Sequence, residues 1–364
     1  MDFAFSEEQQ MLRESARSWL ASRFPPQRVA ELADSAEAWD RSSWREIAEL
    51  GWVGLSVPED QGGAGFGFIE EAVLFEELGR ALYPGPYLAT VGLALPTLAR
   101  SGSLERVLAG EATATLAWAE PSGPHRLDDV ASVSTKASGS NGSWTLSGEK
   151  AFVPDAASAD IAVVAAAAPE GTALFAVEVA RATVGSDSTM DATRRLGRVV
   201  LNETPATMLV RPGEAPAMLE RIRLRALSAV ALEAVGVAQT ALDLAIAYVK
   251  ERKQFDKPIG AYQAVSHQVA DTYMETELAR SLAYWAAWCV AESDAQAPVA
   301  VAAAKSAAAE AAVRACERSI QVHGGTGFTW EHVLHRYYKR AQWIESFEGF
   351  GSHHRKTVAA AILA

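Results

Sequence analysis

The chain has 364 residues, 49% of them apolar, which is enough for two or three domains with sizeable buried cores. Asp and Glu total 45 against 33 Lys and Arg, so the formal charge is −12. This acidic balance argues against nucleic acid or an anionic membrane as the main partner, because both select basic surfaces.

Features that would direct the chain to a membrane or an oxidising compartment are not evident in the sequence. We see no apolar run that approaches the roughly 20 residues needed to span a bilayer. The first eight residues lack the basic and then apolar stretches of a signal peptide. Cys289 and Cys316 lie in Ala-rich, helical surroundings and are expected to be buried thiols, not a disulfide or a metal pair. We therefore expect a cytoplasmic protein with no membrane contact and no metal.

The first domain, residues 1–112, is predicted to be mostly helical. Ser6 followed by acidic residues predicts the start of a helix that runs towards Leu20. Further helices are expected over 43–50 and 68–82. A glycine cluster ends at Gly67, but a dinucleotide-binding G-x-G-x-x-G would need a glycine at Phe68, so we interpret the cluster as a loop.

The second domain, residues 113–212, has the character of a β domain. Short runs rich in strand-forming residues are separated by clusters of Gly, Ser, Pro and Asn. The predicted strands cover residues 115–118, 143–146, 160–164 and 173–179. This pattern is typical of a small antiparallel barrel or sandwich.

The third domain, residues 213–364, returns to helix. Long helices are expected over 215–252, 261–292 and 297–323, the last very rich in Ala. In the second of them an i, i+4 stripe runs from Val265 to Cys289. The pattern predicts a four-helix-type bundle with apolar surface left to bury against a partner subunit, and an α+β fold class overall.

Three segments of the third domain could carry chemistry. Arg252 stands at a helix end and could contact a phosphate, although a solvated helix-end cation is the simpler interpretation of this residue alone. Gly324 and Gly325 offer bare backbone amides to a diphosphate, or simply end a helix. Glu348 lies between Phe347 and Gly349.

A carboxylate in the apolar neighbourhood of Glu348 is expected to have a raised pKa, which suits a general base near neutral pH. The simpler alternative is a solvated loop glutamate. Glu345 is a nearby rival, but it follows an amphipathic stretch and is expected on a helix surface.

Together the three segments resemble the acyl-CoA dehydrogenase family over essentially the whole chain. The motifs are Arg252 to Phe255 with Gln263, Gln321 to Gly325, and Phe347-Glu348-Gly349. The resemblance implies an N-terminal α domain, a middle β barrel and a C-terminal bundle, with FAD as cofactor. The flavin ring would lie between the β domain and the bundle, and the diphosphate end would reach an adjacent subunit.

By this resemblance one set of residues serves FAD held mainly by a neighbouring subunit. The set is Arg252, Phe255, Gln263, Gln321, Gly324 and Gly325. An oligomer is then a functional requirement, either a homodimer or homotetramer or a heterotetramer with a related subunit.

The implied reaction is the α,β-dehydrogenation of an acyl-CoA thioester. Glu348 would take the α-proton while a hydride leaves the β-carbon for the flavin. The base's own backbone N–H and a flavin ribityl hydroxyl would bond the thioester carbonyl and stabilise the enolate. The electrons would pass to an external electron-transfer flavoprotein. Some members carry the base earlier in the C-terminal domain, but that position falls near Ala226, so Glu348 is preferred.

Several positions depart from the family pattern. Ala119 replaces a Thr whose hydroxyl would bond the flavin ring, and Pro154 falls where a Thr is common. Phe152 stands where a Trp is usual. Each lost bond would weaken FAD binding by about 1 kcal/mol.

The usual CoA-binding Asp and Arg are also not obvious. Arg223 and Arg225 lie near their place and are, with Gly349, the candidate substrate contacts, although surface charge explains the arginines equally well. Segments 84–87 and 190–195 are similar to members of actinobacterial catabolic clusters. We therefore expect a divergent branch that acts on branched, cyclic or steroid-type thioesters.

Two other functions remain open. The first is a non-catalytic or half-site subunit of a heterotetramer, favoured by the missing hydroxyls at Ala119 and Pro154 and opposed by Glu348. The second is a flavin monooxygenase or nitroalkane oxidase on the same scaffold, against which Glu348 also weighs.

Overall fold

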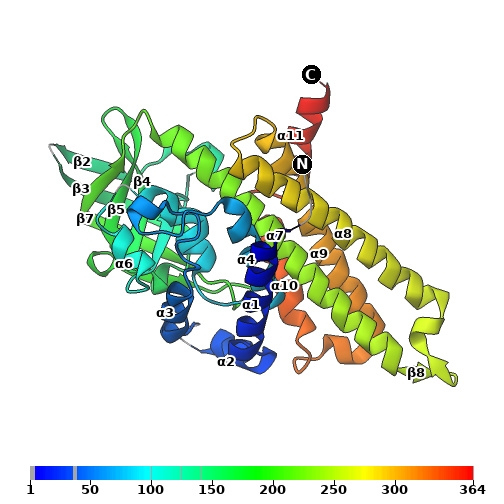
Figure 1. Cartoon of the computed structure of the whole chain (residues 1–364). Helices are drawn as coiled ribbons and strands as arrows, with labels where there is room; N and C mark the ends of the chain where they lie inside the picture. Colours follow the sequence, from blue (N-terminus) through cyan, green and yellow to red (C-terminus); the bar gives the residue numbers. More distant parts are fainter. Residues whose placement is uncertain (1–4, 36–38, 100, 124, 141, 364) are drawn as a thin grey trace. The chain divides into compact units, whose positions relative to one another are not determined.

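A computed structural model describes residues 5–35, 39–99, 101–123, 125–140 and 142–363 (Figure 1). Residues 1–4 of the chain start considered for a signal peptide lie outside this range. Helices form both ends of the chain and strands the middle, which confirms the predicted fold class. The chain divides into two compact units, one of residues 1–31, 68–83 and 227–364, the other of residues 32–67 and 84–226. The boundaries of the three sequence-based domains stay a prediction.

The N-terminal helices follow the predicted local signals. At the start of α1 (Glu7–Arg23), the Gln9 N–H donates to Ser6 Oγ at 3.2 Å and the Ser6 N–H donates to Gln9 Oε1 at 3.0 Å. This reciprocal capping box fixes the expected start. The predicted helices over 43–50 and 68–82 are α3 (Arg41–Glu49) and α4 (Phe68–Arg80), and the glycine cluster is a loop as predicted.

Several short helical segments were not predicted from the sequence. They are α2 (Pro26–Asp34), a π-helical turn (Leu88–Ala94), α5 (Leu95–Leu98) and α6 (Leu104–Leu108). Most are a few residues long, so a hydrophobic period has little length in which to emerge.

The β domain is one seven-stranded sheet. Its strands are β1 (Ala114–Ala117), β2 (Lys136–Ser140), β3 (Ser143–Pro154), β4 (Ile161–Ala168), β5 (Gly171–Glu178), β6 (Thr183–Asp187) and β7 (Leu196–Val210). The pairings β4–β2, β2–β3, β3–β7, β7–β5 and β5–β4 close a ring, so the sheet is a barrel. Most pairs are antiparallel, as expected, but β4 pairs in parallel with β1 and with β2.

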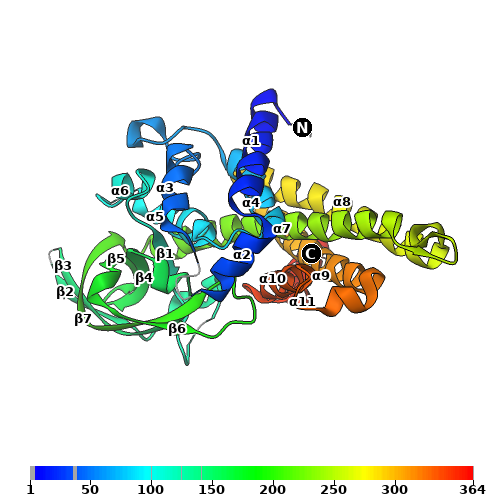
Figure 2. The ribbon, with the colours of Figure 1, turned by 90° about the horizontal axis from the view of Figure 1, so that it is seen from below.

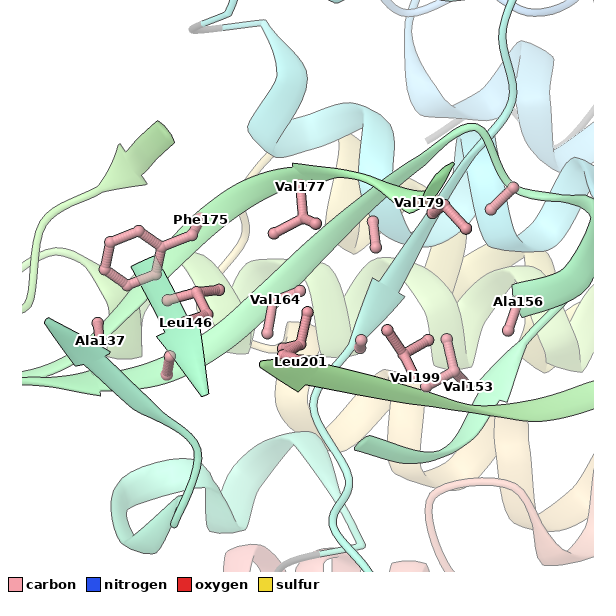
Figure 3. Packing of buried hydrophobic residues seen from close by; sticks show 14 of the residues in the cluster. Ala137, Leu146, Val153, Ala156, Val164, Phe175, Val177, Val179, Val199 and Leu201 are labelled. Carbon is pink, nitrogen blue, oxygen red and sulfur yellow. The ribbon is translucent and has the colours of Figure 1, made fainter. Parts of the chain in front are cut away.

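The barrel interior is filled by small and branched side chains. Leu146, Val164, Phe175 and Leu201 point into it from four different strands (Figure 3). Each of the four is at most 3% exposed. Because every second residue of a strand faces inward, this core sets the register of the strands and therefore the direction of the residues at their ends.

The C-terminal bundle is built from five helices. They are α7 (Ala215–Glu251), α8 (Gln263–Ala291), α9 (Ala297–His323), α10 (Leu334–Ser346) and α11 (Gly351–Leu363). Figure 2 shows α7, α8 and α9 running alongside one another. Cys289 and Cys316 are buried free thiols, as predicted.

The stripe expected on α8 is buried only in part, with Cys289 inside the protein. Tyr273 and Leu278 are 55% and 67% exposed. The buried side chains are small and include Thr276, Ala279 and Ala283. Ala-rich helices approach closely through their small residues, which leaves Tyr273 and Leu278 on the outside of the subunit.

Helix α7 corrects the expectation that no apolar segment of the chain is long enough to span a bilayer. By length and composition it is apolar enough to cross a membrane, although 72% of its most apolar stretch is buried in the protein. Glu233 interrupts the apolar run in the sequence, and inside the protein it pairs with Arg340. A mostly buried core helix passes the same test, so this finding is weak evidence for a membrane span.

Gly236 lies where α7 and α4 approach each other most closely. A Cβ at Gly236 would lie 2.1 Å from the Glu76 carbonyl oxygen, and a Cβ at Gly79 would lie 2.2 Å from that of Glu233. We expect Gly236→Ala to lower the free energy of unfolding by about 2 kcal/mol or more, although Ala is the better helix former, because the helices must separate. Urea denaturation would measure the change. Gly102→Ala, at a site with open space, is the matched control and should be neutral.

Candidate active site

Glu348 lies in a tight turn between α10 and α11. Phe347 has φ −60° and ψ 124°, and Glu348 has φ +55°. The Gly349 N–H donates to the Ser346 carbonyl at 3.2 Å and closes the turn. These are the features of a type II turn, whose third position normally takes glycine. A glutamate here costs about 1–2 kcal/mol of backbone strain, a cost typical of functional positions.

Glu348 is buried, as the sequence predicts, although its surroundings are only partly apolar, because Lys305 Nζ donates to the Gly349 carbonyl next to it. Glu348 is 5% exposed and its neighbour Phe347 is 9% exposed. The Phe347 ring stacks on Trp343 with centroids 5.1 Å apart. The alternative of a solvated loop glutamate is therefore wrong. The rival Glu345 lies on α10 as expected, but it is half-buried instead of fully exposed.

The residues assigned to the diphosphate end of the cofactor lie at the other end of the bundle. Arg252 follows α7 and leads into the hairpin of β8 (Lys253–Gln254) and β9 (Lys257–Pro258). Phe255 at the hairpin tip is 88% exposed with φ +52°. Gln263 opens α8, and Gln321 lies in the last turn of α9. All four side chains are exposed.

Gly324 and Gly325 provide the bare backbone that a diphosphate needs. Gly324 has φ +61° and ψ −137°, and its N–H donates to the Gln321 carbonyl. Both glycines are exposed, and a Cβ built on either meets nothing within 4 Å. The Gly324 N–H is used in this cap, so the exposed Gly325 backbone and the nearby Arg252 are the groups that fit an anion approaching from outside the subunit.

An aromatic stack that the sequence did not reveal joins these two helix ends. His323 stacks on Tyr248 with ring centroids 4.3 Å apart, and the tilted ring of His332 has its centroid 4.6 Å from that of His323. The Arg252 N–H donates to the Tyr248 carbonyl. The stack therefore brings Arg252 and Gly324 to one place, which sequence distance alone could not show.

Within one chain, Glu348 lies far from the residues that the sequence assigns to the diphosphate. Lys305 of α9 contacts the Glu348 turn, whereas Gly324 caps the far end of the same helix. The 19 intervening steps span about 28 Å at 1.5 Å per residue. Figure 1 shows β8 and the end of α9 at the same end of the bundle.

In the β domain, Phe152 is presented by a bulge. The β3–β7 register shifts between Lys150 and Val153, and Phe152 there has φ +53° and is 50% exposed. Bulges commonly direct a side chain towards a site. Ala119 is buried, and its carbonyl accepts the Ala151 N–H at 2.9 Å.

A buried ion pair that the sequence analysis missed lies beside Ala119. Lys150 Nζ donates to Glu120 Oε1 at 2.7 Å, and neither side chain is more than 1% exposed. Burial raises the pKa of Glu120, but hydrogen bonds from Lys150, Thr135 and Ser134 outweigh it and lower the pKa to about 2. Lys150 Nζ also donates to the Trp118 carbonyl, so the pair ties the end of β1 to β3.

The arginines near the start of α7 have partners inside the protein. Arg223 forms two hydrogen bonds to Glu220, and Arg225 Nη2 donates to Ser56 Oγ at 3.0 Å. Both side chains are half-buried, so neither is a simple surface charge. Their role as substrate contacts stays a prediction.

Comparison with known proteins gives the context for these residues. Residues 6–106 match the acyl-CoA dehydrogenase N-terminal domain and residues 219–363 the C-terminal domain. The chain belongs to the acyl-CoA dehydrogenase family. Members are FAD-dependent oxidoreductases, so the prediction of an enzyme of this class is confirmed.

Similar proteins include several from actinobacteria. Acyl-CoA dehydrogenase IpdE2 of Mycobacterium tuberculosis is 35% identical, covering 92% of this chain and 91% of the relative. A variant of the Tcur3481-Tcur3483 steroid ACAD is 33% identical with a TM-score of 0.86, covering 98% of each chain. The ChsE4-ChsE5 complex from Mycobacterium tuberculosis is 27% identical with a TM-score of 0.88, covering 100% of this chain and 99% of the other.

Proposed function

We propose that this acyl-CoA dehydrogenase desaturates an acyl-CoA thioester between its α- and β-carbons, with Glu348 as the catalytic base. The observation that carries the proposal is a carboxylate side chain only 5% exposed on a residue with φ +55°. A strained backbone and a buried carboxylate both lower the stability of the fold. A catalytic role explains why Glu348 keeps both, because a base must be held at a fixed place near the α-carbon of the substrate.

The residues divide the chemistry as follows. Glu348 removes the α-proton, and its dry surroundings keep water from competing for the carboxylate. The Glu348 backbone N–H bonds the thioester carbonyl, where negative charge develops as the proton leaves. The chemistry that bound FAD would supply is acceptance of a hydride from the β-carbon, with an external electron-transfer flavoprotein as the acceptor of the electrons. Phe152 and Ala119 contribute to the flavin-facing edge of the β domain.

The expected substrates are branched, cyclic or steroid-type thioesters. The similarity to a protein named a steroid ACAD supports this class. The deciding experiment is anaerobic bleaching of the bound flavin by butyryl-CoA, cyclohexanecarbonyl-CoA and a cholesterol-side-chain acyl-CoA. Bleaching by one of the last two and not by butyryl-CoA is expected, and bleaching by none of the three would contradict the proposed activity.

The exposed diphosphate set favours a flavin site shared between two subunits. Arg252, Gly324 and Gly325 face outward at the end of the bundle opposite Glu348, so we infer that they hold the cofactor of a second copy. Leu278 of α8 and Ile362 of α11, 67% and 73% exposed, offer apolar surface for that copy.

Arg252→Gln is expected to weaken FAD retention about 10- to 100-fold, because a charge-assisted hydrogen bond of about 1.5–3 kcal/mol is lost. Absorbance of the flavin after gel filtration measures this.

A hybrid of Arg252→Gln and Glu348→Gln subunits shows whether each flavin site is shared between two subunits or lies within one subunit. If the sites are shared, one site of each hybrid pair regains both intact residues and half the activity returns. If each subunit holds its own flavin, every site lacks one residue, and the hybrid stays inactive at FAD concentrations too low to load Arg252→Gln.

A half-site subunit of a heteromer is the second candidate. The missing hydroxyls at Ala119 and Pro154 favour it, and the similarity to a chain of the ChsE4-ChsE5 complex supports an unlike partner. Purification of this chain alone decides between the two. A yellow protein that bleaches with substrate supports the self-sufficient enzyme, whereas a colourless protein that gains no flavin from added FAD supports the partner role.

A further inference from the structure

Lys305 is a fully buried lysine directly beneath the Glu348 turn. It lies on α9 and its side chain is 0% exposed. Its Nζ donates to the Glu345 carbonyl at 2.8 Å and to the Gly349 carbonyl at 2.8 Å. These two carbonyls flank Glu348 in the sequence, so a single ammonium group joins both sides of the turn.

A second contact holds the same turn from α11. His354 is 1% exposed, and its Nε2 lies 3.1 Å from the Gly349 carbonyl oxygen. Because a carbonyl can only accept, Nε2 carries the proton in this contact. The Gly349 carbonyl therefore receives donors from two helices, and the turn cannot rotate without losing both.

The burial of Lys305 lowers the stability of the fold. Burial lowers the pKa of Lys305 to about 7, although the charges of Glu345 and Glu348 act in the opposite direction. A buried lysine is a poor choice for stability, and an apolar residue of similar size often does as well. Either protonation state of the amine has at least two N–H donors, so both bonds to the carbonyls survive loss of the charge.

We infer that Lys305 is a positioning residue that holds the Ser346–Gly349 turn so that the Glu348 carboxylate meets the α-carbon of the thioester. This inference rests on the proposed role of Glu348 as the base. Misplacement of a catalytic group by about 1 Å can cost about 100-fold in rate, so two hydrogen bonds that fix the turn have a large effect on proton abstraction.

The test measures proton abstraction alone. tert-Butylacetyl-CoA has α-hydrogens but none on its β-carbon, so it exchanges α-protons for deuterium in D2O without being oxidised. Mass spectrometry follows the exchange in the FAD-loaded wild type and in Lys305→Met, Lys305→Gln, Glu348→Gln and the Lys305→Met/Glu348→Gln double variant. Cys316→Ala is the matched control, because Cys316 is buried on the same face of α9, three turns further on.

We expect exchange about 100-fold slower in Lys305→Met and about 10-fold slower in Lys305→Gln, which keeps one donor group. Thioester affinity, FAD content and the control variant should change by less than a few fold. In the Glu348→Gln background, Lys305→Met should have no further effect, because the residue acts through the base.

The outcomes separate the two proposals. Normal exchange in Glu348→Gln contradicts the role of Glu348. Slow exchange in Glu348→Gln with normal exchange in Lys305→Met contradicts only the role of Lys305. Equal slowing by Lys305→Met in both backgrounds also overturns it, because the lysine would then act independently of the base. If Lys305→Met does not fold, Lys305→Gln and its double variant with Glu348→Gln give the same comparison.

Discussion

Glu348→Gln is expected to fold, bind FAD and bind the acyl-CoA thioester, but to bleach its flavin at least about a thousandfold more slowly. The amide has nearly the shape of the carboxylate and no basicity, so it removes general-base catalysis, which is worth about 10²–10⁴ in rate. Stopped-flow anaerobic reduction gives the rate, and equilibrium titration gives the affinity. Near-normal bleaching would rule out Glu348 as the base.

Two further variants make this result specific. Glu345→Gln neutralises the other carboxylate of the segment, on α10, and should bleach within a few fold of the wild type. Glu348→Gly removes the carboxylate and relieves the left-handed backbone at φ +55°. We expect it to be inactive and more stable by about 1 kcal/mol, because glycine tolerates that conformation without steric cost. Loss of stability in Glu348→Gly would mean that the side chain holds the turn together.

The sequence predicts the long helices of the C-terminal domain well. The three long C-terminal helices differ from their predicted limits by at most two residues, because each is long and is bounded by residues that break helices. The burial of Glu348 could also be predicted, because a glutamate between Phe347 and Gly349 carries a local signal that needs no knowledge of distant contacts. Its role as the base stays a prediction.

The features that could not be predicted from the sequence depend on contacts between distant segments. Lys305 and Lys150 look like ordinary lysines in the sequence, and only the folded chain brings them to the Glu348 turn and to Glu120. On α8, the apolar pattern alone does not show that small residues such as Ala279 and Ala283 form much of the buried face. The parallel pairing of β4 with β1 likewise depends on barrel closure, which no local pattern encodes.

The buried Glu120–Lys150 pair provides the largest expected change in stability. Lys150→Met should lower the free energy of unfolding by about 3–5 kcal/mol, because Glu120 keeps its charge in the interior without its ammonium partner. Equilibrium urea unfolding would measure this, and FAD retention should fall as well, because the pair fixes the end of β1 next to Ala119.

The double variant Glu120→Gln/Lys150→Met removes both charges and should recover most of that loss of stability. Recovery shows that the loss comes from an unpaired buried charge and not from a lost packing contact.

The pH dependence of stability gives a second test. Because the folded pKa of Glu120 is about 2, below that of an unfolded glutamate, its ionised form stabilises the fold above about pH 4.5, and this contribution is lost as the pH falls towards 2. Lys150→Met removes a hydrogen bond that lowers this pKa, so the variant should lose less additional stability between pH 5 and pH 3 than the wild type. An equal acid loss in both proteins would show that the ion pair does not set the acid response of the barrel.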